Sequence, residues 1–181
     1  MSRPNKKRRR SHLDDFHRNA AGEYVYEGAH YVCTAGAAAR GRLVRRLWAL
    51  GALMAAATVA VGCVDAPGLD GCVWLLLPYV AEVAAVGSVV WALCRLSAGG
   101  ARLRAYVYRA SIKALPGRAI ASAVTAAIGL CAEALFLVLN GAGERLPAAV
   151  VVFANQAIIT AAALVLRRAV QRTAWEEETR A

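Results

Sequence analysis

Four long stretches of the sequence contain no lysine or arginine, and each is almost entirely apolar. They cover residues 47–64, 72–94, 119–139 and 148–166. A helix needs about 20 apolar residues to cross the ~30 Å hydrocarbon layer of a bilayer, so these lengths fit. Hydrophobic residues make up 59% of the chain, against about 45–50% in soluble domains. These stretches exclude an ordinary water-soluble fold and predict four transmembrane helices.

The sequence also lacks the motifs that mark common enzyme and metal sites. It contains no compact ligand spacing such as Cys-x-x-Cys or His-Glu-x-x-His. It has no phosphate-cradling glycine loop, nucleophile elbow or dinucleotide fingerprint. The residues of the amino-terminal part that could in principle bind a metal are His12, Asp14, Asp15, His17, His30 and Cys33. Because their spacing is irregular, we expect no metal, no cofactor and no catalytic activity.

Basic residues are almost absent from one side of these stretches. Of the 22 lysines and arginines, 21 fall in the amino-terminal arm, the middle connection and the carboxyl-terminal tail, and Arg145 alone falls on the other side. Lysine and arginine near the ends of spans are held on the cytoplasmic side of a membrane. The pattern therefore predicts four spans with both termini in the cytoplasm. It also accounts for the net charge of +10 without a nucleic-acid partner.

The expected fold is an all-α integral membrane protein, a four-transmembrane-helix bundle with a small cytoplasmic arm. The arm covers residues 1–46, the membrane domain 47–166 with a basic cytoplasmic loop at 95–118, and the tail 167–181. We expect the tail to continue the last span as a helix that frays. The first apolar stretch begins too late for a normal signal peptide, so we expect the first span to direct insertion.

The arm contains a candidate β-hairpin at residues 23–32. Tyr24, Tyr26 and Tyr31 favour strand, and Glu27 and Gly28 suit its turn. An isolated hairpin is marginally stable in water. If it is ordered, it must lean on the bilayer surface, on the middle loop or on a partner.

The middle loop carries bases and no acid. Leu103, Tyr106, Val107 and Ala110 recur at helical spacing within it, which favours a short amphipathic helix in the headgroup plane over a plain basic linker. Each base near the surface attracts anionic headgroups by about 1 kcal/mol. The residues expected to contact anionic lipid are Arg45, Arg46, Arg102, Arg104, Arg109 and Lys113.

Carboxylic acids are rare within the spans, but Glu82 lies near the middle of the second and Glu133 near the centre of the third. Intramembrane acids are costly and usually face a bundle interior or a wet cavity. Low dielectric disfavours the charged form, so each should be protonated unless paired. Asn155 and Gln156 occur at similar depth in the fourth span. We expect Glu82, Glu133 and one of these two amides to form a polar layer.

This polar layer allows two interpretations. Neutral side chains that hydrogen-bond across helices would fix the bundle or an oligomer, at about 0.6–2 kcal/mol per bond. Alternatively, the carboxylates would bind a proton, a cation or a cationic solute for transport. A separate choice concerns Cys63 and Cys72, which flank the first outer turn. They are candidates for a disulfide or for two free thiols.

We expect a non-enzymatic subunit or scaffold of a membrane complex, located in the cell membrane. Its partners would be a bilayer with anionic headgroups and either a second copy of the chain or another membrane protein. The alternative is a small transporter or channel that couples protons or cations through Glu82 and Glu133.

Overall fold

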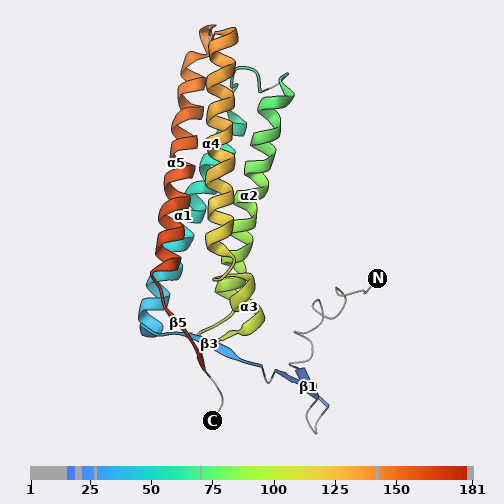
Figure 1. Cartoon of the computed structure of the whole chain (residues 1–181), viewed down its shortest axis with the longest axis vertical. Coiled ribbons are helices and arrows are strands. Elements are labelled where there is room, and N and C mark those ends of the chain that lie inside the picture. The colour runs from blue at the N-terminus through green and yellow to red at the C-terminus, as the bar shows by residue number, and fades with distance from the viewer. Residues whose placement is uncertain (1–15, 19–21, 27, 70, 142, 179–181) are drawn as a thin grey trace, which may run out of the picture.

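The computed structural model describes residues 16–18, 22–26, 28–69, 71–141 and 143–178, and it is mostly helical (Figure 1). Four long helices form its body: α1 (Gly36–Cys63), α2 (Val73–Ala98), α4 (Leu115–Asn140) and α5 (Leu146–Gln171). All four are long and apolar enough to cross a membrane. The prediction of four such helices is confirmed.

The helices extend beyond the apolar stretches at the end of the bundle where the bases lie. A helix of 26 residues is about 39 Å long, which exceeds the ~30 Å hydrocarbon layer. The extension beyond the apolar stretch is longest in α1, which begins at Gly36 instead of near residue 47. Arg40, Arg45 and Arg46 therefore lie on the first turns of α1, and the arm that precedes the bundle is shorter than we expected.

The four long helices form a closed ring in which α1 packs against α2, α2 against α4, α4 against α5, and α5 against α1. Figure 1 shows them side by side along one long axis. Inside the ring, fully or almost fully buried side chains form the main core: Leu47, Met54, Val89, Leu93, Leu96, Ile159 and Leu166. A smaller cluster of Val61, Ala66 and Val152 lies nearer the two short loops.

The two short loops contact each other at the end of the bundle opposite the bases. Asp65, after α1, forms an ion pair of 3.2 Å with Arg145, at the end of the 3-10 turn η1 (Gly143–Arg145). Gly68 has φ +78°, and a Cβ atom there would lie 2.5 Å from the ring of Phe136. Glycine at this turn therefore allows both the backbone conformation and the close approach of α4.

A small sheet closes the other end of the bundle. Its central strand β3 (His30–Cys33) lies between β4 (Leu103–Arg104) and β5 (Trp175–Glu178), and both pairings are antiparallel. The short helix α3 (Ala105–Ala110) follows β4 directly. We call β3, β4, β5 and α3 together the cap. It joins the arm, the middle connection and the tail (Figure 1).

The hairpin expected over 23–32 was wrong. Tyr24–Tyr26 (β2) and β3 are both extended, but β2 pairs with β1 (Phe16–Arg18) and β3 pairs with β4 and β5. A two-stranded hairpin would leave one edge of β3 without a partner, whereas the cap provides a strand on each side. At the end of β2 the Tyr26 hydroxyl donates to the carbonyl of Ala29 and accepts from the N–H of Ala105, which ties β2 to the start of α3.

Two further expectations are corrected in the cap. The tail continues the last span as a helix only as far as Gln171, and residues 175–178 then form β5. In the middle loop a helix does form, but α3 has only six residues. Leu103 is fully buried, and Val107 packs against the main core. This apolar face therefore packs against the bundle.

Aromatic and polar contacts join the elements of the cap to one another. The rings of Tyr31 and Tyr108 stack at 4.2 Å. The Tyr31 hydroxyl donates to Oε2 of Glu177 at 2.9 Å, and this hydrogen bond raises the pKa of Tyr31 above its ordinary value. Arg102, immediately before β4, forms an ion pair of 3.2 Å with Glu178 of β5. The acidic tail residues thus offset part of the positive charge of the middle loop.

Candidate functional site

One buried polar side chain from each long helix lies in the interior of the bundle. Thr58 comes from α1, Glu82 from α2, Glu133 from α4 and Gln156 from α5. Their exposed fractions are 4%, 0%, 3% and 3% respectively. We call these four residues the polar layer. Since polar groups are costly in an apolar interior, the contacts among them decide what the layer can do.

Glu82 is the best connected member of the polar layer. The Thr58 hydroxyl donates to its Oε1 at 3.2 Å, and the Gln156 side chain also interacts with its carboxyl group. The backbone carbonyl of Thr58 accepts a hydrogen bond of 3.3 Å from the hydroxyl of Tyr79. These hydrogen bonds join α1 to α2, and the amide of Gln156 brings α5 to the same level.

Two glycines leave the space that these contacts need. A Cβ atom at Gly129 would lie 3.2 Å from Nε2 of Gln156, so glycine on α4 lets the amide of α5 enter the layer. A Cβ atom at Gly62 would collide with the hydroxyl of Tyr79. Small residues of this kind allow close approach between helices in membrane proteins.

Three buried oxygens of the layer lack a hydrogen-bond partner among the described residues: Oε2 of Glu82, Oε1 of Glu133 and Oε1 of Gln156. Glu133 and Gln156 line a cavity of about 20 Å³ together with Tyr79 and apolar side chains. A cavity needs roughly 10–15 Å³ to hold one water molecule. The space therefore matches a single water and is too small for a larger solute.

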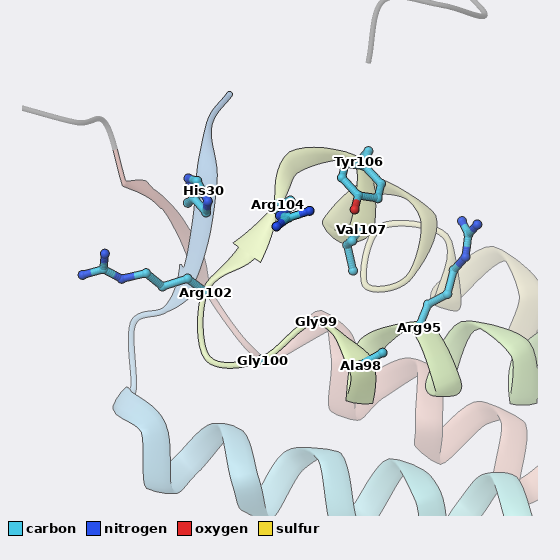
Figure 2. Close-up of a pocket in the computed structure, with 9 residues that line it drawn as sticks. All are labelled: His30, Arg95, Ala98, Gly99, Gly100, Arg102, Arg104, Tyr106 and Val107. Atoms are coloured by element: carbon cyan, nitrogen blue, oxygen red, sulfur yellow. The ribbon is translucent and has the colours of Figure 1, made fainter. Parts of the chain in front are cut away.

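A second candidate site is an open pocket of about 600 Å³ beside the cap. Its walls come from β3, β4, α3 and the carboxyl-terminal end of α2. One histidine and three arginines line it, and no acidic side chain does: His30, Arg95, Arg102 and Arg104. Figure 2 shows Arg95 rising from the end of α2, Arg104 directed toward Tyr106, and Arg102 extending away from both.

The two sites differ in chemistry, since the polar layer is buried beside a very small cavity while the basic pocket is open and lined by cationic side chains. The described residues contain no group of three metal-binding side chains. No family model, curated protein or solved structure matches this chain.

The structure distributes the predicted polar residues unevenly. Glu82, Glu133 and Gln156 lie in the layer, whereas Asn155 is half-buried and lies outside it. Thr58 belongs to the layer but was not predicted. Its signal was a hydroxyl in the first span at a depth similar to that of the acids, which is weak because threonine is ordinary in helices.

The residues predicted to contact anionic lipid lie at the cap end of the bundle, and all are exposed: Arg45, Arg46, Arg102, Arg104, Arg109 and Lys113. Only Arg102 and Arg104 line the basic pocket. Arg95 and His30 line it too and were not predicted for it, because they belong to segments far apart in the sequence. Cys63 and Cys72 are both free, the first exposed and the second half-buried, so the disulfide alternative is not formed.

Proposed function

We propose that this chain is an integral membrane protein of the cell membrane and a non-enzymatic subunit or scaffold of a membrane complex. Four helices long and apolar enough to span a bilayer support the first part. Basic residues at the start of α1, the end of α2, the start of α4 and the end of α5 support an orientation with both termini in the cytoplasm. On this orientation the cap lies in the cytoplasm.

The observation that carries the proposal is the closed polar layer. All four long helices contribute to it, no member is more than 4% exposed, and the adjoining cavity is about 20 Å³. Within the layer the Thr58–Glu82 hydrogen bond ties α1 to α2, and the small adjoining space leaves no room for a passing solute. Its chemistry suits a fixed bundle that presents a surface to a partner.

The cap supplies that surface on the proposed cytoplasmic side. It draws strands from three distant segments onto one end of the bundle, and Trp48 on α1 donates to Ser97 on α2 at 2.7 Å beneath it. A surface built from several fixed segments loses little conformational entropy when it binds. This favours a scaffold over a passive membrane anchor.

One observation favours the alternative of a proton- or cation-coupled transporter. Glu133 is buried, yet within the described ranges no hydrogen bond reaches its Oε1. A costly acid without a partner is the usual mark of a functional site in a membrane interior. The two proposals therefore need an experiment that separates them.

Vesicle flux and assembly provide that experiment. We expect the reconstituted protein to show no proton or cation flux above empty vesicles, and the protein extracted from native membranes to migrate well above its 19.1 kDa mass. We expect Glu82→Gln and Glu133→Gln to assemble as the parent does, because glutamine keeps a neutral hydrogen-bonding side chain. Flux in the parent that both variants lose while assembly persists would replace the subunit proposal with the transporter. Migration as a lone monomer would also contradict it.

Cysteine labelling tests the proposed orientation. In a background without the five native cysteines, Gly71→Cys should react only with impermeant reagent added outside, and Lys113→Cys only after the membrane is opened. Gly71 is exposed and has open space where a side chain would go, and Lys113 is exposed at the other end. The reverse labelling pattern would invert the topology, and labelling of both sites from one side would refute four spans.

A further inference from the structure

The basic pocket beside the cap has a composition that neither the bundle nor its orientation explains. Lysines and arginines that serve only to orient a span can lie anywhere near its end. Here His30, Arg95, Arg102 and Arg104, from three separate segments, surround one space of about 600 Å³. The fold thus concentrates positive charge around a concave space.

Arg95 and Arg104 have no carboxylate partner within the described ranges; the ion pairs found there join Arg102 to Glu178 and Arg145 to Asp65. Arg102 therefore already has an acidic partner in the tail. Arg95 and Arg104 keep their full charges at the pocket and are available to an anionic ligand.

Aromatic rings hold these two arginines in place without neutralising them. The guanidinium of Arg104 lies 5.5 Å from the ring centre of Tyr26, and that of Arg95 lies 5.7 Å from the ring centre of Trp91. Tyr26 is itself fixed, since it is 7% exposed and hydrogen-bonded to Ala29 and Ala105. A cation–π contact restrains a guanidinium while leaving its N–H donors free. Each guanidinium is therefore restrained by a ring while its donors stay available to an oxyanion.

The turn that forms the floor of the pocket requires glycine. Gly100 has φ +63°, a conformation that other residues rarely adopt. A Cβ atom at Gly99 would lie 2.5 Å from the side chain of Leu103. This turn connects the end of α2 to β4, so that Arg95 and Arg104 line the same pocket.

We propose that the basic pocket binds a phosphate monoester group. Two unpaired guanidinium groups match its charge of about −1.5 to −2 at neutral pH better than the single charge of a phosphodiester. The group could belong to a lipid headgroup or to a small soluble phosphate. Trp91 is 60% exposed one turn from Arg95, and tryptophan prefers the membrane interface, so a headgroup can reach the pocket. The lipid source rests on the membrane embedding and anionic-lipid contact proposed above.

Binding of matched lipids tests this site. The full-length protein would be mixed with phosphatidic acid, which carries a monoester, or with phosphatidylglycerol or phosphatidylcholine of the same acyl chains, and the bound lipid measured by native mass spectrometry. We expect phosphatidic acid to bind most tightly. The double variant Arg95→Gln/Arg104→Gln should weaken it by about tenfold or more, as expected when charge-assisted hydrogen bonds are lost. Glycerol 3-phosphate would be titrated into protein held in phosphatidylcholine nanodiscs.

The control is Arg42→Gln/Arg168→Gln, which removes two exposed charges at the same end of the bundle but outside the pocket lining. Loss of phosphatidic acid binding only in the pocket variant supports a headgroup site. The same dependence with glycerol 3-phosphate supports a soluble ligand. Equal binding of phosphatidic acid and phosphatidylglycerol, or equal loss in both double variants, overturns the site and leaves only a diffuse attraction to acidic lipid. If the protein bound acidic and neutral lipids equally, the proposed contact with anionic lipid would be wrong as well. The flux and assembly results do not depend on this outcome.

Discussion

Tyr31→Pro is expected to release both outer strands of the cap at once. Tyr31 is paired with Leu103 on β4 and with Glu177 on β5. Proline cannot donate a backbone hydrogen bond and is excluded from central strands. The substitution also removes the stacking on Tyr108 and the hydrogen bond to Glu177. Hydrogen exchange measured across residues 103–104 and 175–178 should speed up by about tenfold or more, which corresponds to about 1.4 kcal/mol of lost local stability.

Tyr24→Pro is the matched control for this prediction. Tyr24 lies on β2, which pairs with β1 and belongs to the other sheet. Exchange in β4 and β5 should therefore stay at the parental rate, and the helical circular dichroism of both variants should be unchanged. If Tyr31→Pro left the exchange of both outer strands unaltered, or if Tyr24→Pro accelerated it equally, the cap would not be held together by β3.

The positions of the long helices followed from the sequence because they depend on local properties. Apolar length predicts each helix, and the side on which bases lie predicts its direction. The cap did not follow, because its pairings join residues about 70 to 150 positions apart, such as His30 with Arg104 and Glu178. Strand propensity marked Tyr31 and Val32 as extended, but it does not specify the partner of a strand.

The candidate sites, like the fold, could be predicted only where local sequence determines them. Glu82 and Glu133 could be singled out because an acid within a span is rare and costly. Asn155 and Gln156 are adjacent, so they point about 100° apart around α5, and only the packing of the ring shows that Gln156 faces inward. The basic pocket required Arg95, at the end of α2, to meet Arg104 across a turn. No spacing rule predicts that meeting.

Within the polar layer, Glu82→Leu should destabilise the bundle and Glu133→Leu should not. Leucine at position 82 would remove the acceptor of the Thr58 hydroxyl and a contact of Gln156, leaving buried polar groups without a partner. We expect a loss of about 1–2 kcal/mol in the free energy of unfolding within a bilayer, as for other interhelical hydrogen bonds. Glu82→Gln, which keeps an acceptor, should stay within about 0.5 kcal/mol of the parent.

Glu133 is the informative comparison because it is equally buried, on the same layer, yet no hydrogen bond reaches its Oε1 within the described ranges. Replacing an unsatisfied buried polar group by leucine should be neutral or stabilising. Steric trapping in bicelles would measure both variants, with Val80→Leu on the exposed face of α2 as the control for added bulk. A larger loss for Glu133→Leu than for Glu82→Leu would mean that the hydrogen bonds of Glu82 do not hold the layer together. The expected order would instead leave Glu133 as an acid that costs stability without supporting the fold, and so the residue at which a proton-coupled activity should first be sought.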